Sequence, residues 1–210
     1  MSLNLVDRRF IAYAQKWKPP EIPLWFLLGW IAQESLGNLA DITLKVAEWR
    51  PIGERSWFQV SKPEIEDMKV DPEKLLVDPD YSMQVGIALV RRYMRFLDAI
   101  AGRSNWAFAG SSDYWRMVKL IHAIGPGSFR NYAEQIKSPL WTEWERYSQS
   151  DPHLYKWIGN ANAVYDKGRE LESESQAVSS TPTEPPAQAS PSSAGGDFDT
   201  GADTEEGVGK

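Results

Sequence analysis

The stretch "PLWFLLGWIAQESLGN", Pro23–Asn38, determines how the rest of this chain is interpreted. A proline in the first turn suits a helix start, because the N–H that it lacks would have no partner there. From Leu24 onward apolar residues lie all round the predicted helix, which is typical of a helix at the centre of a domain. The run then meets one carboxylate, Glu34. Burying an ionised carboxylate without partners is costly, so Glu34 either marks where the helix reaches water or has a chemical role.

The composition predicts one folded domain with an acidic appendage. The chain has 210 residues, of which 42% are apolar and ten are Trp, enough for a substantial core. The net charge is -6, but Leu171–Lys210 holds eight acidic residues and one Lys, so the rest of the chain is close to +1. A near-neutral body lacks the concentrated basic face that nucleic-acid binding requires, so we expect no nucleic-acid partner.

Several other classes of protein are disfavoured. The chain has no Cys and only two His, His122 and His153, so we expect neither disulfides nor a metal site. The longest apolar run, Leu24–Ala32, is too short to span a bilayer. The N-terminus lacks the basic, apolar and small-residue layout of a secretory signal. We therefore expect a protein made in the cytoplasm without a signal peptide.

Most of the sequence has helical periodicity. Proline, glycine and capping residues mark the ends of the expected helices. These lie at Leu3–Trp17, Leu24–Ser35, 71–76, 78–100, 112–124, Ser128–Ile136, Leu140–Ser148 and Leu154–Leu171.

Two regions depart from this helical pattern. Between Asp41 and Asp78 the helical signal fades, and Gly53 as a turn, followed by Trp57, Phe58 and Val60 as strand formers, predicts a small β or irregular lobe. From Glu172 to Lys210 the chain is rich in Ser, Pro, Gly and acids, so we expect a disordered tail. The predicted fold class is mainly α, as a helical domain over residues 1–171 around a buried central helix.

Four stretches in order carry a family resemblance: "AQESLGN" (Ala32–Asn38), "GERSWFQVS" (Gly53–Ser61), "DPDYSMQVGIALVRRYM" (Asp78–Met94) and "LIHAIGPGSF" (Leu120–Phe129). Together they resemble the lysozyme-like lytic transglycosylases, the family that includes goose-type lysozyme. The resemblance implies an α+β lysozyme-like fold and cleavage of peptidoglycan between N-acetylmuramic acid and N-acetylglucosamine, without metal or organic cofactor. It also suggests a phage or prophage product that acts on the cell wall, with peptidoglycan strands and virion or lysis proteins as its partners.

The resemblance assigns roles residue by residue. Glu34 matches the catalytic acid and Ser35 its Ser partner, while Gln59 keeps an amide that in the family contacts substrate. Ser56 stands where the family has Gly, and His122 and Ala123 replace a Tyr and an Asn. Tyr165 matches a Tyr that hydrogen-bonds the catalytic carboxyl.

Elementary chemistry agrees with an acid at Glu34. Cleavage of a glycosidic bond needs a group that can protonate the leaving oxygen. Apolar neighbours such as Trp30 and Ile31, together with the negative end of the helix dipole, would disfavour the anion of Glu34. The catalytic glutamate of lysozyme is a known example of a carboxyl whose pKa is raised by apolar surroundings.

Other roles stay open. The lytic members of the family use a single carboxylate, on which pattern Glu34 alone would suffice. Glu54 and Glu48 are either a second carboxylate or ordinary surface loop acids, and the second interpretation is favoured for both. Trp57 and Phe58 either stack on sugar rings or belong to the core. His122 either orients the acid or is a structural histidine.

Three functional hypotheses follow. The first is a muramidase, with Glu34 as catalytic residue and Ser35, Phe58, Gln59, His122 and Tyr165 at the substrate site. The second is a sugar-binding or structural virion protein that keeps the fold without the activity. The third, a helical adaptor, rests on composition alone.

Overall fold

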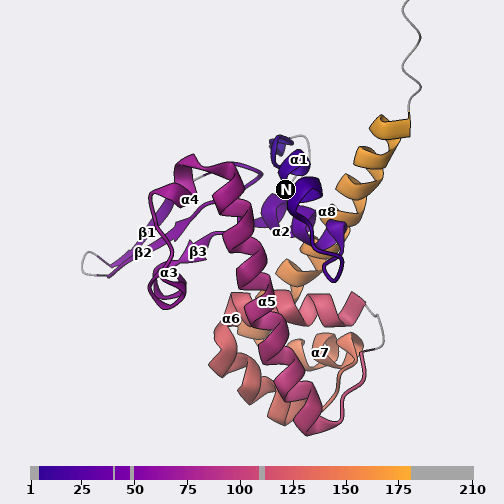
Figure 1. The fold of residues 1–210 in the computed structure, drawn as a ribbon. Coiled ribbons are helices and arrows are strands. Elements are labelled where there is room, and N and C mark those ends of the chain that lie inside the picture. The colour runs from indigo at the N-terminus through magenta and orange to yellow at the C-terminus, as the bar shows by residue number, and fades with distance from the viewer. Residues whose placement is uncertain (1–4, 40, 48–49, 109–111, 181–210) are drawn as a thin grey trace, which may run out of the picture. The chain divides into compact units, whose positions relative to one another are not determined.

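The computed structural model describes residues 5–39, 41–47, 50–108 and 112–180 of the chain, and the side chains of these residues except 41–52 and 178–180. It confirms a mainly helical domain with a small β lobe (Figure 1). The helices are α1 (Phe10–Trp17), α2 (Leu24–Glu34), α3 (Lys62–Met68), α4 (Lys74–Val77), α5 (Pro79–Ser104), α6 (Ser112–Ile136), α7 (Trp141–Ser148) and α8 (Pro152–Ser180). The strands are β1 (Asp41–Ala47), β2 (Arg50–Arg55) and β3 (Val60–Ser61).

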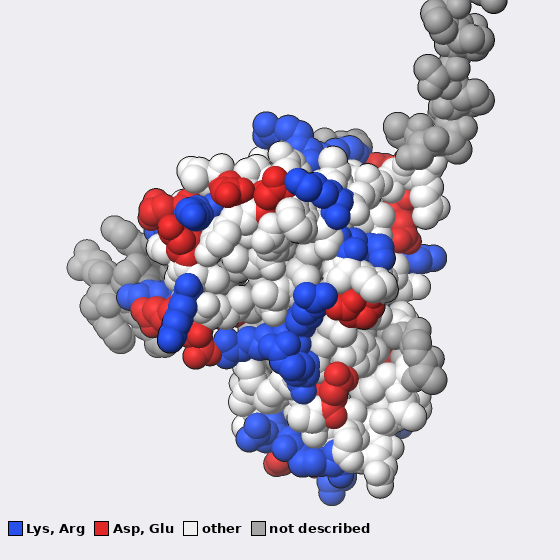
Figure 2. Space-filling view, in the orientation of Figure 1, with Lys and Arg blue, Asp and Glu red and all other residues white. Residues whose placement is uncertain are grey.

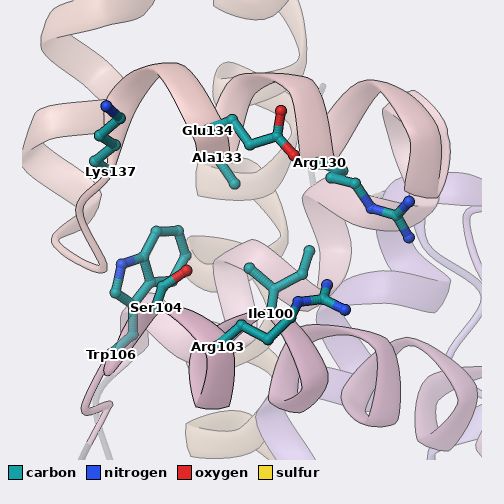
Figure 3. Close-up of a pocket in the computed structure, with 8 residues that line it drawn as sticks. All are labelled: Ile100, Arg103, Ser104, Trp106, Arg130, Ala133, Glu134 and Lys137. Carbon is teal, nitrogen blue, oxygen red and sulfur yellow. The ribbon is translucent and has the colours of Figure 1, made fainter.

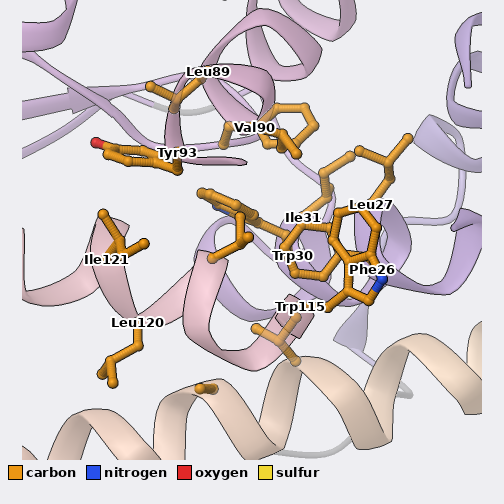
Figure 4. Close-up of a cluster of buried hydrophobic side chains, with 14 of the residues drawn as sticks. Phe26, Leu27, Trp30, Ile31, Leu89, Val90, Tyr93, Trp115, Leu120 and Ile121 are labelled. Atoms are coloured by element: carbon orange, nitrogen blue, oxygen red, sulfur yellow. The ribbon is translucent and has the colours of Figure 1, made fainter. Parts of the chain in front are cut away.

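Helix α2 is the centre of the domain, as its apolar sequence predicts. All residues from Trp25 to Ala32 are buried. Figure 4 shows Phe26 and Trp30 among side chains of α5 and α6, including Val90 and Trp115. Burying large aromatic and aliphatic side chains stabilises such a core by about 1.5–3 kcal/mol each, so α2 holds the surrounding helices in place.

Two glycines allow α2 and α8 to cross closely. A Cβ atom on Gly29 would lie 1.9 Å from the carbonyl oxygen of Val164, and one on Gly168 would lie 2.0 Å from that of Trp25. Neither position has room for a side chain. The crossing fixes the axis of α2 and hence the place where its last residue, Glu34, leaves the core.

Most of the helix signals in the sequence are confirmed, but no helix was predicted over α3, which lies in the region assigned to the β or irregular lobe. The Asp78 side chain caps α5 by accepting a hydrogen bond from the N–H of Tyr81 at 3.0 Å. The predicted stop at Gly125 is a break within α6, where Gly125 has φ 79° and ψ 152°. At the start of α3, Glu64 accepts from the N–H of Ser61 at 2.7 Å, in the capping-box pattern Ser-x-x-Glu.

The lobe is a three-stranded antiparallel sheet in the order β1-β2-β3. The sequence predicted a hairpin in this region, but its parts were placed wrongly. Gly53 lies within β2 opposite Thr43 and does not form the turn. Trp57 and Phe58 lie in the tight turn between β2 and β3 and are buried, because this turn packs against the helices.

Two predicted helix ends are corrected. Helix α1 begins at Phe10, because residues 5–9, which the prediction placed in this helix, are tied to the end of α2 by the N–H of Asp7, which donates to the carbonyl of Leu36 at 2.8 Å. The predicted start at Leu3 lies outside the described residues. Helix α8 continues past Leu171 to Ser180.

The boundary predicted at Leu171 therefore falls inside a packed helix. Leu171 is fully buried, and Glu172 accepts from the N–H of Trp25 at 3.3 Å. Glu174 pairs with Arg8 at 2.9 Å. Glu172 and Glu174 therefore connect α8 to the rest of the domain and do not belong to a tail. The remaining predicted tail, 181–210, lies outside the described residues.

Two further features of the described part bear on the predicted partners. None of its helices has the length and apolar character needed to cross a membrane. Figure 2 shows Lys, Arg, Asp and Glu interspersed on the face displayed.

The α2–α8 crossing gives a direct stability test. Gly168→Ala should destabilise the domain by about 1–3 kcal/mol or more, because the new methyl group would overlap the backbone of Trp25. Gly159→Ala is the matched control in the same helix, where a Cβ would meet nothing within 4 Å. That control should stabilise the domain by about 0.5–1 kcal/mol. The measurement is urea denaturation of each variant, and equal effects would contradict the close crossing.

Candidate functional site

Glu34 emerges at the end of α2, beside the lobe. Its side chain is 17% exposed, whereas the residues before Gln33 are buried. The buried Ser35 hydroxyl lies within hydrogen-bonding distance of the carbonyl oxygens of Ile31 (3.1 Å) and Trp57 (3.0 Å). The indole N–H of Trp57 donates to the carbonyl of Gly37 at 2.9 Å. These contacts hold the lobe against the end of α2. Ser35 therefore helps to fix the position of Glu34.

Lys119 forms an ion pair with Glu34 that was not predicted from the sequence. Its Nζ lies 2.6 Å from Glu34 Oε1, and only 1% of its side chain is exposed. The ammonium also lies 4.9 Å from the centre of the Trp30 ring. A buried ammonium requires a counter-charge, so Glu34 is an anion in this arrangement. The apolar surroundings expected for Glu34 are present, but they enclose a cation as well.

His122 extends this network and is neutral. Its Nδ1 lies 3.1 Å from Lys119 Nζ. An ammonium can only donate, so Nδ1 is the acceptor and the ring proton lies on Nε2, which is 4.0 Å from Glu64 Oε1. Burial, followed by the charge of Lys119, lowers the pKa of His122 well below its usual 6.5.

Glu64 is another carboxyl of the site, and it accepts several hydrogen bonds. Besides the N–H of Ser61, it accepts from the Ser61 hydroxyl at 2.8 Å and from the Tyr93 hydroxyl. Burial and the nearby Glu64 charge raise the pKa of Tyr93, so its phenol keeps the proton that it donates.

Glu54 lies at the same junction but is without such support. It is half-buried on β2, in register with Ser61 of β3. Within the described part of the chain, no ion pair or hydrogen bond reaches its carboxyl. Burial raises the pKa of Glu54 most, and the charge of Glu34 acts in the same direction. The charge of Lys119 opposes them, and the charge of Glu64 raises the pKa by the least.

An open pocket of about 590 Å³ lies beside Glu64 and His122, and neither Glu34 nor Glu54 is among its lining residues. Glu64 and His122 form part of its wall, and the break at Gly125 forms another part. Its remaining lining residues are Ser61, Pro63, Glu66, Asp67, Arg92, Tyr93 and Pro126. The pocket thus offers polar and charged groups to a ligand beside the chain of contacts that leads through Lys119 to Glu34.

Ser56–Gln59, the turn expected to meet substrate, is in the interior. Phe58 is fully buried against Gly86 of α5, where a Cβ would lie 2.0 Å from its ring. Gln59 is 1% exposed, and its amide donates to the carbonyl of Ser56. Contact of Phe58 or Gln59 with a glycan would require this turn to move. Ser56 has φ 73°, a conformation that favours glycine, which agrees with the Gly expected at this position.

Tyr165 is placed away from the carboxyl cluster. Its ring packs edge-on against Trp25, near the start of α2, with centroids 5.1 Å apart. The Arg116 guanidinium lies over the same ring at 4.3 Å. Among the described residues no hydrogen bond joins Tyr165 to Glu34. A different α8 residue is near the cluster: Lys167 donates to Gln33 at 2.7 Å, and the charge of Glu34 acts on it.

The structure therefore brings Glu34, Ser35, Glu54 and His122 together, and adds Lys119 and Glu64. Both added residues left a signal in the sequence. Lys119 is a lone cation in an apolar helical run, one turn before His122. Glu64 completes the capping box with Ser61. Glu48, the other candidate second carboxylate, lies outside the described residues.

A second pocket, of about 570 Å³, lies at the far end of α5 and α6 (Figure 3). Arg103, Arg130 and Lys137 give it a basic lining around Trp106, with Glu134 as its one acid. It contains no pair of carboxyls and is not the acid–base site.

Comparison with protein-family models, curated proteins and solved structures gives no match to this chain. The functional argument therefore depends on the residues and their geometry.

A double-mutant cycle tests the Lys119–Glu34 pair. Glu34→Gln should destabilise the domain at neutral pH by about 2–4 kcal/mol, because it leaves the buried ammonium without a counter-charge. Glu34→Gln with Lys119→Met should be more stable than Glu34→Gln alone, since the unpaired charge is gone. Urea denaturation of the four proteins measures both effects. Additive effects would show that the two groups do not interact.

Proposed function

We propose that this chain cleaves the β-1,4 bond between N-acetylmuramic acid and N-acetylglucosamine in peptidoglycan. The observation that carries the proposal is the meeting of Glu34, Glu54 and Glu64 where the buried helix joins the lobe. Glu34 pairs with the Lys119 ammonium, Glu64 lies beside His122, and the charges of both carboxyls act on Glu54. The three carboxyls are therefore not equivalent, because like charges disfavour ionisation. Glycosidic cleavage uses carboxyl groups in different protonation states.

The choice of peptidoglycan as substrate class comes from the ordered motifs. Their residues lie close to one junction: Glu34 and Ser35 end α2, the turn Ser56–Gln59 packs on Ser35 through Trp57, and Gly86 receives Phe58. Gly125 and His122 border the adjacent pocket. The same motifs suggest a phage or prophage protein that reaches the wall as part of a virion or through a lysis system.

The proposed reaction needs no metal or organic cofactor. A carboxylic acid protonates the glycosidic oxygen, the bond from that oxygen to the anomeric carbon breaks, and a carboxylate stabilises the positive charge that develops on the sugar. Either water or the 6-hydroxyl of the same sugar then attacks the anomeric carbon. The second route gives a 1,6-anhydro end, as in the lytic transglycosylases that the motifs resemble.

Two observations favour a second candidate, a sugar-binding or structural virion protein without activity. Gln59, the amide expected to contact substrate, is buried, and His122 and Ala123 stand in place of a Tyr and an Asn. We place this candidate second because Glu54 is a half-buried carboxyl that has no ion pair or hydrogen bond among the described residues, which a purely structural role does not explain.

Digestion of purified peptidoglycan tests the proposal. The wild type should release muropeptides, and mass spectrometry of the new ends distinguishes 1,6-anhydro from hydrolysed products. Glu34→Gln should reduce the rate by at least about 100-fold, because a carboxamide can neither donate a proton nor balance positive charge. Glu170→Gln, at an exposed position on α8, is the matched control and should be as active as wild type. Binding of peptidoglycan by the wild type without cleavage would favour the second candidate.

A further inference from the structure

We infer that Glu54 donates the proton in this reaction, while Glu34, paired with Lys119, remains the anion that stabilises the sugar cation. The inference rests on the proposed function and changes the role that the family resemblance gives to Glu34. It is carried by the different partners that the three carboxyls of the junction have.

Two of the three carboxyls are supplied with partners that favour a negative charge. Glu34 has the Lys119 ammonium at 2.6 Å. Glu64 receives hydrogen bonds from Ser61 and Tyr93. Donors of this kind stabilise an ionised carboxylate. Both groups are therefore suited to be anions at neutral pH.

Glu54 is the carboxyl best suited to hold a proton. It is half-buried, and among the described residues it has no donor or cation of its own. The nearest ammonium is already engaged by Glu34 and by His122, which is neutral and adds no positive charge. Ionised Glu54 would add a third negative charge to a partly desolvated site. Its pKa is raised by burial first and then by the charge of Glu34, which together outweigh the opposing charge of Lys119, and Glu64 adds a smaller increase.

The chemical step balances with these assignments. The Glu54 carboxyl gives its proton to the glycosidic oxygen, and the electron pair of the breaking bond goes to that oxygen, which leaves as a sugar hydroxyl. Glu34 stabilises the cation at the anomeric carbon. When water or the 6-hydroxyl adds to that carbon, its proton passes to the Glu54 carboxylate and restores the acid.

A leaving-group test separates this role from a structural one. Glu54→Gln should cleave peptidoglycan about 100- to 10,000-fold more slowly than wild type. It should lose less than about 10-fold on a dinitrophenyl β-glycoside of a chito-oligosaccharide, whose phenolate leaves without a proton. Glu34→Gln should lose activity on both substrates, and Glu170→Gln on neither.

The pH dependence provides a second readout. Wild-type cleavage of peptidoglycan should fall on the alkaline side as Glu54 ionises, and this limb should be absent with the dinitrophenyl glycoside. Full activity of Glu54→Gln on peptidoglycan, or equal losses on both substrates, would overturn the inference and leave the proposed function standing. Retention of aryl-glycoside cleavage by Glu34→Gln instead would identify Glu34 as the acid. A wild type that cleaves no peptidoglycan would overturn both proposals.

Discussion

The Lys119 ammonium is buried in the domain, 2.6 Å from Glu34. This ion pair determines the electrostatic environment of the polar groups around it. Desolvating an ammonium is so costly that a buried one must have a carboxylate beside it. Glu34 can provide that charge only because the Gly29–Gly168 crossing fixes α2 and directs its end toward α6. Lys119 is engaged by Glu34, and among the described residues the neighbouring carboxyl of Glu54 has no ion pair of its own. One pair thus gives different surroundings to groups of the same chemical type.

Much of the fold could be predicted because the signals were local. The all-round apolar run from Leu24 predicted a central helix, and proline, glycine and capping residues located most of the other helix ends. The prediction failed where tertiary contacts decide. The acids beyond Leu171 have a disordered-type composition, yet Glu172 and Glu174 bind Trp25 and Arg8 and extend the helix.

The candidate site was predictable only in part. Its motifs located Glu34, Ser35 and His122, and named Glu54 as a second carboxylate, because these residues occur in an interpretable order along the chain. The partners of Glu34 did not follow from that order. Lys119 is more than eighty residues from Glu34 in the sequence, and only the packing of α6 on α2 brings its ammonium to the carboxylate. The packing of α8 on α2 placed Tyr165 next to Trp25, away from the cluster.

Glu34 and Glu54 should be in opposite protonation states at the same junction, and carbon-13 NMR of the glutamate side-chain carboxyls can measure both states in one protein. Glu34→Gln and Glu54→Gln, each lacking one signal, assign the two resonances in the wild type. The account predicts that the Glu34 signal is that of a carboxylate at neutral pH. The Glu54 signal should titrate above the ordinary value of 4.5 for a glutamate. A Glu54 signal that titrates at or below that value, or a Glu34 signal of a carboxylic acid at neutral pH, would contradict it.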